Sequence, residues 1–264
     1  MLKISKLYKV FHHGEINEKI ALQDINLILE PGEFVTVIGG NGAGKSTLLN
    51  CIAGVYIPEE GTIFLDGQGI TKLPDYRRAA SICRIFQDPM IGTAASLTVE
   101  ENMALAQRRG LRRRLSRAIT QNERKQFKTK LAGLELGLED RLNTPAKLLS
   151  GGQRQALALL MATLVRPKLA LLDEHTASLD PKTATLVLQL TKTLFEKENI
   201  TTLMITHNME QALRLGKRLI MLHEGSIILD VNDGEREGLT VPRLVDLFHG
   251  ASGEQLQNDR LLLN

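Results

Sequence analysis

Several residue types are scarce in this chain of 264 residues, and each scarcity narrows the class of protein. Tryptophan is absent and aromatic residues make up only 4% of the sequence, whereas there are 22 glycines. This composition argues against a β-sandwich and favours an α/β enzyme with many tight turns between strands and helices. Hydrophobic residues make up 43% of the chain, which is enough for a substantial core and excludes a disordered chain.

Cysteines and long apolar runs are also lacking. Cys51 and Cys83 lie far apart without CxxC spacing, so they indicate neither a disulfide framework nor a zinc site, and a reducing cytoplasm fits. The longest apolar run, residues 156–165, is too short to span a bilayer, and residues 1–11 alternate polar and apolar side chains, unlike a signal peptide. We therefore expect a soluble chain that meets a membrane only through a partner or the lipid surface.

The chain has little excess of positive over negative charge, since its net charge is only +3. A net charge this small does not indicate a polyanionic partner, and we expect no nucleic acid to bind the chain as a whole. One exception is the basic segment, residues 108–117, which holds six arginines and no acidic residue. Its alternatives are a solvated helix face, a contact with anionic lipid or an acidic loop of a membrane partner, and local nucleic-acid binding.

The hydrophobic pattern predicts an α/β fold with a mainly parallel sheet. Residues 2–11 and 22–29 read as two strands of an N-terminal antiparallel β layer, with a polar connection between them. Helical patterns separate several of the later strands, as in a parallel sheet covered by helices. These later strands are predicted at residues 34–38, 82–86, 169–173, 201–206 and 218–222.

Helices dominate the middle of the chain. Thr98 and Glu101 form a capping box, and the pattern from Arg154 to Val165 is strongly helical. Asp180 and Pro181 supply an N-cap and an N1 proline for a further helix. We interpret the chain as one domain over residues 1–251, with a core of 1–89 and 165–251, an α-helical insertion at about 90–164, and a polar tail at 252–264.

A phosphate-binding motif follows the first buried strand. Residues 39–46 match GxxxxGK[ST] between that strand and a helix ended by Gly54. In this context backbone N–H groups and the helix N-terminus point at a β-phosphate, Lys45 bridges the β- and γ-phosphates, and the Ser46 hydroxyl ligates Mg²⁺. The motif predicts P-loop nucleotide binding by Gly39, Asn41, Gly42, Ala43, Gly44, Lys45, Ser46 and Thr47.

Two carboxylates end the strand at residues 169–173. Ligands of open parallel sheets bind at the carboxyl ends of the strands, so Asp173 is placed to hold Mg²⁺ and Glu174 to polarise an attacking water as general base. Such an acidic pair also occurs simply as the start of a helix. The P-loop elsewhere in the chain favours the catalytic interpretation.

A second anion site is predicted where Ser150, Gly151, Gly152 and Gln153 open a helix, because the first N–H groups of a helix are exposed there. The same letters also make an ordinary loop and cap. The order of all the motifs favours the anion site over the ordinary cap. With LSGGQRQ at residues 149–155, the chain resembles the ABC ATPase family over roughly residues 4–230.

The resemblance implies a head-to-tail homodimer that sandwiches two ATP molecules. Ser150 and Gly152 of one subunit would close on the γ-phosphate held by the P-loop of the other. By the same resemblance Gln87 is the Q-loop residue that contacts Mg²⁺ and the water, and His207 touches the γ-phosphate. Residues 178–180, which include Ser178 and Asp180, resemble the D-loop. A polar strand cap at Gln87 and a structural histidine at His207 stay as alternatives.

Two further positions bear on the resemblance, a candidate contact for adenine and a departure from the family pattern. Adenine usually stacks on an aromatic residue of the first strands in this family, and Phe11 fits the Lys-x-aromatic pattern, while Tyr8 and a plain core role remain alternatives. His175 stands where the family usually has proline after the catalytic glutamate. Proline there serves backbone shape, so we expect His175 to take no part in proton transfer.

We therefore expect the ATP-hydrolysing subunit of an ABC transporter, bound to the cytoplasmic face of the cell membrane. Glu174 is the expected base, assisted by Lys45, Gln87 and His207, and ATP and Mg²⁺ are the expected cofactors. Ser46, Gln87 and Asp173 are the expected metal ligands. The expected partners are a second copy of the chain, separate transmembrane permease subunits and an extracytoplasmic solute-binding protein.

The direction of transport and the cargo are less constrained. The segment Asp-Glu-His-Thr at residues 173–176 resembles ATPases of amino-acid importers, including tryptophan or tyrosine uptake systems, so import of a small solute such as an amino acid is expected. The alternatives are an exporter-type subunit, a non-transport ABC ATPase of translation or DNA repair, and a nucleotide-dependent scaffold. The presence of Glu174 and His207 argues against the scaffold.

Overall fold

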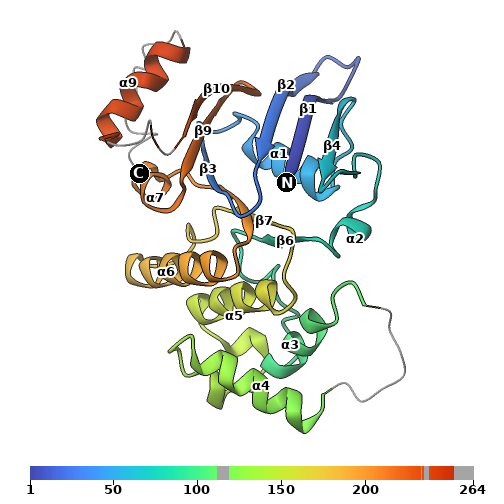
Figure 1. Ribbon diagram of the computed structural model, residues 1–264, viewed down its shortest axis with the longest axis vertical. Helices are drawn as coiled ribbons and strands as arrows, with labels where there is room; N and C mark the ends of the chain where they lie inside the picture. Colours follow the sequence, from blue (N-terminus) through green and yellow to red (C-terminus); the bar gives the residue numbers. More distant parts are fainter. Residues whose placement is uncertain (112–118, 233, 235–237, 253–264) are drawn as a thin grey trace. The chain divides into compact units, whose positions relative to one another are not determined.

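A computed structural model describes residues 1–111, 119–232, 234 and 238–252 (Figure 1). The chain divides into two compact units. The first unit comprises residues 1–78 together with the chain from residue 201 onward, and the second unit comprises residues 79–200. The division into a core and a helical insertion at residues 90–164 stays a prediction, and the predicted tail beyond residue 252 lies outside the described residues.

The first unit contains an antiparallel sheet with the strand order β2-β1-β4-β5. Leu2 and Ile4 of β1 are buried at alternate positions, and after irregularities in the pairing with β2 the burial continues at Leu7 and Val10. The predicted antiparallel layer is thus confirmed, although β2 begins three residues earlier than expected, and β4 and β5 were not predicted. The strands are β1 (Leu2–Phe11), β2 (Lys19–Leu29), β4 (Glu60–Leu65) and β5 (Gln68–Gly69).

A second set of strands in the first unit has the order β10-β9-β3-β8. β3 pairs in parallel with β8 and β9, whereas β10 pairs antiparallel with β9. Every residue of β3 is buried, as expected for a strand with neighbours on both sides. The strands are β3 (Phe34–Ile38), β8 (Thr201–Ile205), β9 (Arg218–His223) and β10 (Ser226–Val231).

Helices of the first unit support the end of β3. Ile38 belongs to an apolar cluster that includes Met209, Leu244 and Phe248. The ribbon shows α9 beside α7 and β10 (Figure 1). This packing places a rigid core directly before the predicted P-loop. The helices are α1 (Lys45–Ala53), α2 (Asp75–Arg78), α7 (Met209–Leu215) and α9 (Val241–Ser252).

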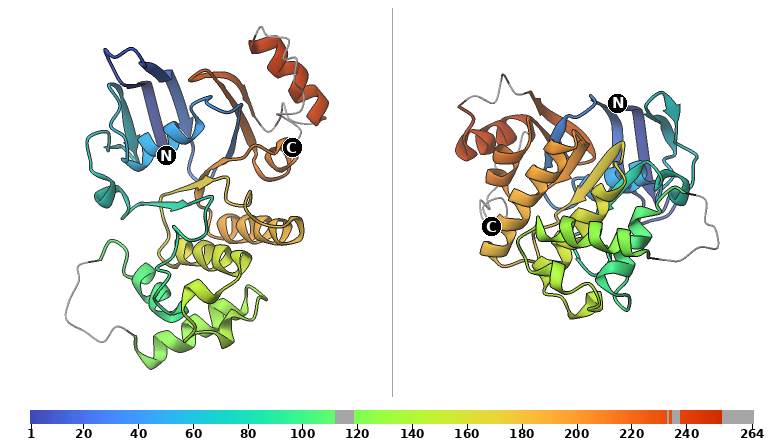
Figure 2. Two further views of the ribbon diagram at one scale, coloured as in Figure 1. Left: turned by 180° about the vertical axis from the view of Figure 1, so that it is seen from behind. Right: turned by 60° about the horizontal axis from the view of Figure 1, so that its bottom comes forward.

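The second unit combines two parallel strands with a set of helices. The strands β6 (Ile82–Ile85) and β7 (Leu169–Asp173) pair with each other, and α5 and α6 run side by side (Figure 2). At Gly152 a Cβ atom would lie 2.1 Å from Cγ2 of Thr183, so glycine permits this close approach of the two helices. The helices are α3 (Val99–Gln107), α4 (Gln121–Ala132), α5 (Gly151–Leu164), α6 (Pro181–Lys197), η1 (Leu138–Asp140) and η2 (Ala146–Leu148).

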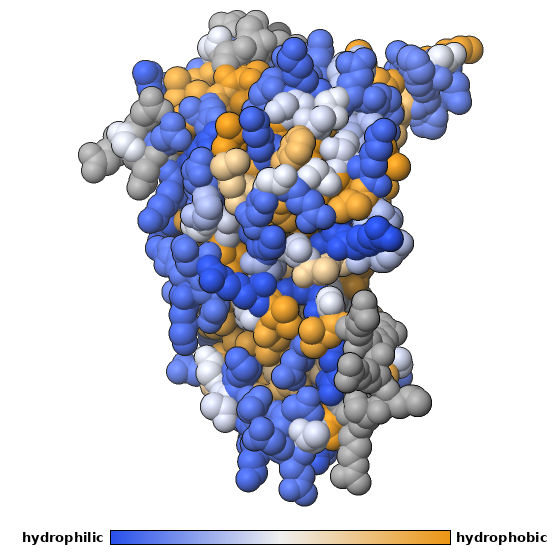
Figure 3. All heavy atoms as spheres, turned by 45° about the vertical axis from the view of Figure 1, so that its right-hand side comes forward, coloured by the Kyte–Doolittle hydropathy of each residue, from blue (hydrophilic) through white to orange (hydrophobic). Residues whose placement is uncertain are grey.

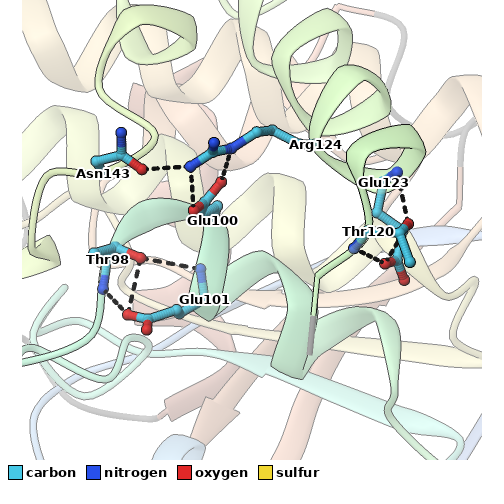
Figure 4. Close-up of polar contacts among 7 residues, drawn as sticks. All are labelled: Thr98, Glu100, Glu101, Thr120, Glu123, Arg124 and Asn143. Atoms are coloured by element: carbon cyan, nitrogen blue, oxygen red, sulfur yellow. Dashed lines mark hydrogen bonds and ion pairs between the residues drawn. The ribbon is translucent and has the colours of Figure 1, made fainter. Parts of the chain in front are cut away.

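Side-chain bonds fix the starts of α3 and α4 and link the two helices (Figure 4). The predicted capping box of Thr98 and Glu101 is present, and Thr120 caps α4 in the same way. Arg124 of α4 donates from Nε and Nη2 to the two carboxylate oxygens of Glu100, both at 2.6 Å. Two parallel charge-assisted bonds give this contact a defined geometry, so it orients α4 on α3.

The basic segment is described only in part, because residues 112–118 lie outside the described residues. Arg108 donates to Ala104 O at 2.9 Å and to Glu123 at 3.1 Å. Arg109 donates to the backbone oxygens of Ala162 and Val165. Two of the six arginines are therefore engaged within the chain itself, and the lipid or partner interpretation rests on the other four. No helix in the described ranges is long and apolar enough to cross a bilayer.

Candidate functional site

The P-loop of the first unit is packed too closely to accept side chains at two positions. Gly39 has φ 152° and a Cβ atom there would lie 2.2 Å from Leu222 O, while Gly44 has φ 99° and its Cβ atom would lie 2.5 Å from Ala21 O. Glycine alone tolerates this combination of backbone angle and contact. The loop is therefore held in one conformation by β9 and β2.

The helix behind the P-loop begins at an open N-terminus. Among the described residues no side chain caps α1, and its first turn contains no acidic residue. The unsatisfied N–H groups and the helix dipole favour an anion at this point. Nζ of Lys45 donates to Gly39 O at 2.8 Å and Gly40 O at 3.0 Å, so the ammonium lies against the loop. This arrangement fits the phosphates of a nucleotide.

His207 lies beside the P-loop within the first unit. β3 and β8 are parallel neighbours in which Val37 is level with Ile205, and Thr206 N donates to Val37 O at 3.1 Å. Since carboxyl ends of parallel strands meet at one edge of a sheet, the segments that follow both strands are brought together there. Asn208 caps α7 through Gln211 N at 2.9 Å, which leaves the exposed His207 at the tip of a fixed turn.

Phe11, the residue predicted to stack on adenine, ends β1 and contacts two neighbouring side chains. Its ring packs edge-on against Tyr56 with centroids 5.2 Å apart, and Nζ of Lys9 lies 5.3 Å from its centroid. Lys9 is itself held by Glu59 Oε1 at 2.6 Å. Tyr8, the alternative, lies level with Glu60 in the β1–β4 ladder. Tyr56 is an aromatic neighbour that sequence analysis did not single out.

In the second unit Asp173 ends β7 and forms an ion pair that the sequence did not reveal. Nη2 of Arg84, on the neighbouring strand β6, donates to Oδ2 of Asp173 at 2.9 Å. The same guanidinium lies over the ring of Phe86, 4.7 Å from the centroid. A charged residue in a strand predicted to be buried is the signal that points to Arg84.

Glu174 has a left-handed backbone with φ 43°, which non-glycine residues rarely adopt. The next residue, His175, is buried, and its Nε2 lies 2.9 Å from Oγ1 of Thr191 on α6. Because the Thr191 hydroxyl donates to Val187 O at 2.8 Å, Nε2 of His175 must carry the proton. Burial lowers the pKa of His175 to about 4, so the imidazole is neutral near pH 7.

The LSGGQ segment forms the start of α5. Ser150 Oγ accepts from Gln153 N and Gln153 Oε1 accepts from Ser150 N, both at 3.2 Å, while Gln153 Nε2 donates to Leu136 O at 3.1 Å. The hydroxyl proton of Ser150 is not used by this box and can be donated to an anion. Arg154 fixes the preceding segment by donating to the carbonyls of Ala146, Lys147 and Leu149.

A hydrogen bond from a side chain to the backbone links the predicted Q-loop and D-loop residues of the second unit. Gln87 is exposed, and its carbonyl accepts from Ser178 Oγ at 3.1 Å. Asp180 caps α6 by accepting from Thr183 N at 3.1 Å, and hydrogen bonds from Thr183 lower the pKa of Asp180. The predicted N-cap at Asp180 and N1 proline are confirmed. Ser178, which the resemblance to the ABC ATPase family places in the D-loop, makes the link to Gln87.

The oxygen ligands predicted for magnesium suit that ion, since Mg²⁺ prefers a few carboxylate or hydroxyl oxygens together with phosphates of its substrate. Ser46 carries a hydroxyl oxygen, Asp173 a carboxylate and Gln87 an amide oxygen. Within the described ranges there is no group of three or more His, Cys, Asp and Glu that could hold a metal ion.

Comparison with known proteins agrees with these features. The family described as "ABC transporter" matches residues 22–177. A tyrosine transport ATP-binding protein of Clostridioides difficile is 45% identical over 95% of this chain and 100% of its own length. The methionine import ATP-binding protein MetN of Haemophilus ducreyi is 36% identical over 86% of this chain, which spans 64% of that protein.

Solved structures show the same fold. A dimeric ATP-binding cassette in a post-hydrolysis state, bound to ADP and phosphate, has a TM-score of 0.75 at 32% identity and covers 88% of this chain and 99% of its own. A cassette of an ABC transporter in its ADP conformation also has a TM-score of 0.75, at 26% identity, and covers 95% and 98%. The α/β fold predicted from the sequence is thus confirmed.

Proposed function

Because this chain belongs to the ABC transporter ATP-binding family and is an ATPase subunit, we propose that two copies of it bind two ATP molecules with Mg²⁺ between them and drive solute transport through separate membrane subunits. The observation that carries the proposal is a pair of helix starts, one in each unit. Among the described residues neither α1 nor α5 has an acidic residue in its first turn. Both are therefore suited to an anion.

The two helix starts make a homodimer chemically reasonable. The P-loop and α1 supply N–H groups and Lys45 to the phosphates of one nucleotide, and Ser150 at the start of α5 supplies a hydroxyl donor. In a head-to-tail dimer each nucleotide receives the P-loop of one subunit and the Ser150 and Gly152 region of the other. The similarity to a dimeric cassette bound to ADP and phosphate supports this arrangement.

Hydrolysis then needs a base, a charge clamp and a positioned water. We assign the base to Glu174, which accepts the proton of the attacking water, and the donors Lys45 and the partner copy's serine at position 150 stabilise charge on the γ-phosphate. His207, exposed beside the P-loop, positions the γ-phosphate and the water, and Gln87 orients the same water. Mg²⁺, held by Ser46, Gln87 and Asp173, would neutralise charge on the β- and γ-phosphate oxygens.

The relatives guide the proposal on cargo and direction. The tyrosine transport protein matches over its whole length, and MetN is an import protein, so we assign import of an amino acid, with an aromatic one favoured. Import of this kind uses an extracytoplasmic solute-binding protein and places the chain at the cytoplasmic face of the membrane. An exporter-type subunit and a non-transport ATPase are the alternatives, and isolation of the chain with ribosomes instead of permease subunits would favour the latter.

Apolar side chains exposed on the second unit support contact with membrane subunits. Hydrophobic residues interrupt the hydrophilic surface in several places (Figure 3). Met90 and Ile91, just after the predicted Q-loop residue, are 43% and 61% exposed. Exposed apolar residues beside a functional loop are typical of an interaction surface. Leu105, Leu111 and Leu148 are the other large exposed apolar residues in the described part of this unit.

The central test is Glu174→Gln. This variant loses the base but keeps the phosphate cradle, so we expect ATP affinity near that of the wild type, no turnover, and a stable dimer with ATP and Mg²⁺ in sedimentation analysis. Lys45→Ala is the matched control, because it removes a phosphate contact and should abolish ATP binding and dimerisation together. A Glu174→Gln variant that binds ATP and stays monomeric would refute the two-ATP dimer.

A further inference from the structure

Arg84 is a charged residue in the middle of a strand whose other side chains are apolar. Its neighbours Cys83 and Ile85 are buried, and β6 pairs in parallel with β7, which ends at Asp173. The side chains of Arg84 and Asp173 are only 16% and 15% exposed. A pair of charges so shielded from water interacts more strongly than a pair on the open surface.

A second contact fixes the orientation of the guanidinium. Its central carbon lies 4.7 Å from the centroid of the Phe86 ring, where the negative face of the ring attracts a cation. The planar guanidinium group stacks on such a ring in a way that an ammonium group does not. Arg84 is thus held between the carboxylate of Asp173 and the ring of Phe86, the residue directly before the Q-loop residue Gln87.

We propose that Arg84 is a positioning residue for Asp173 and that its charge lowers the affinity of the nucleotide site for divalent cations. The inference rests on the proposed function, in which Asp173 helps to hold Mg²⁺. The bond from Arg84 engages Oδ2 of that carboxylate and limits its rotation. A divalent cation near the same carboxylate meets a charge that is already compensated and is repelled by the guanidinium.

The consequence is an ordered loading of the site. Phosphates of ATP bring enough negative charge to outweigh the repulsion, whereas Asp173 paired with Arg84 attracts free Mg²⁺ only weakly. Metal binding therefore depends on bound nucleotide. The arginine also keeps the Asp173 carboxylate paired between turnovers, so the strand end does not carry a shielded and uncompensated charge.

Three substitutions separate charge from positioning. Arg84→Gln keeps a hydrogen-bond donor for Asp173 but removes the charge, Arg84→Met removes both, and Arg84→Lys keeps the charge without the planar group. With a non-hydrolysable fluorescent ATP analogue as the probe, the Mg²⁺ concentration for half-maximal binding should fall about tenfold in Arg84→Gln and Arg84→Met. Arg84→Lys should stay within about twofold of the wild type. Turnover should fall in Arg84→Met and be largely rescued in Arg84→Gln.

Direct titration with Mn²⁺, followed by its electron paramagnetic resonance signal with and without the ATP analogue, gives a readout that does not depend on activity. We expect Arg84→Gln to bind Mn²⁺ more tightly in both cases. If Arg84→Met unfolds, Arg84→Gln alone carries the test. Metal concentrations unchanged from the wild type in Arg84→Gln would overturn the inference and leave Arg84 as a packing residue.

Asp173→Asn distinguishes this inference from the proposed function. Removal of the carboxylate should raise the Mg²⁺ and Mn²⁺ concentrations needed for half-maximal binding. If Asp173→Asn leaves them unchanged, the role of Asp173 in metal binding fails, and the inference fails with it. If Asp173→Asn shifts them and the Arg84 variants do not, the proposed function stands and only the assignment of Arg84 fails.

Discussion

The burial of neutral His175 predicts a specific loss of stability in mild acid. In the unfolded chain the imidazole has its ordinary pKa of 6.5, whereas burial lowers the pKa in the folded chain to about 4. Between these values the unfolded state binds more protons than the folded state, so protonation favours unfolding. The contribution of neutral His175 to the free energy of unfolding is fully present above pH 6.5 and is lost as the pH falls toward about 4.

The magnitude follows from the difference between the pKa of His175 in the unfolded chain and its pKa in the folded chain. A tenfold change in the proton-binding constant is worth about 1.4 kcal/mol, so the complete loss amounts to about 3 kcal/mol, of which about 2 kcal/mol is reached near pH 5. His175→Gln is the matched variant, because its amide N–H can donate to Thr191 Oγ1 in place of Nε2 but does not titrate. The other ionisable groups are common to both proteins and cancel in the difference.

The assay is urea unfolding of both proteins at about pH 7 and about pH 5, followed by far-ultraviolet circular dichroism. The wild type should lose about 2 kcal/mol more than His175→Gln over this change. Equal losses in the two proteins would show that His175 titrates normally in the folded state. Burial and the bond to Thr191 would then not hold the imidazole of His175 in its neutral form.

Two further predictions concern the P-loop and the helical part of the second unit. Gly39→Ala should reduce ATP affinity at least about tenfold by calorimetry, because its Cβ atom meets a backbone oxygen at 2.2 Å, whereas Gly40→Ala, with nothing within 4 Å of its Cβ atom, should bind normally. Equal affinities would refute the packing argument. Arg124→Met should lower the midpoint of urea unfolding, since it removes both short bonds to the carboxylate of Glu100. Lys128→Met, which removes an exposed ion pair at 3.4 Å, should cost less than about 0.5 kcal/mol.

Parts of the fold with a strong local signal were predictable from the sequence. The segment from β3 through the P-loop to α1 combines an apolar run with glycines at the spacing that a phosphate-binding loop requires. The helix α4 was not predicted, although Thr120 and Glu123 spell a capping box, because only Phe127 and Leu131 of that helix are buried. Two apolar residues four apart make too narrow a stripe to stand out from a polar sequence.

Edge strands gave weaker signals for a different reason. β10 follows β9 through a two-residue turn, Glu224 and Gly225, and both residues have positive φ. Such a turn is suited to a hairpin, but glutamate in its first position hides the usual Asn-Gly or Asp-Gly pattern. Four successive residues of β10 are only partly buried, so the strand lacks the continuous burial that marked β3. Tertiary pairing, not local preference, defines it.

In the candidate site, too, some residues could be predicted from local sequence and others could not. The motif residues lie in short contiguous stretches, and the sequence identifies them because the chemistry of phosphate binding requires fixed spacings. The contact of Arg84 with Asp173 joins positions 89 residues apart, and that of Ser178 with Gln87 joins positions 91 apart. No pattern within one segment encodes a pairing between distant segments. Such contacts depend on strand order and register.

The bond from Ser178 to Gln87 has a consequence for variation at position 87. Ser178 donates to the carbonyl oxygen of Gln87, and Gln155 donates to that of Phe86 at 3.2 Å. The backbone at position 87 is therefore held without use of the glutamine side chain. Any residue substituted at position 87 keeps both backbone bonds, so its side chain starts from the same point. Evolution, or a saturation library, can therefore exchange the chemical group presented at this point while the loop that presents it keeps its course.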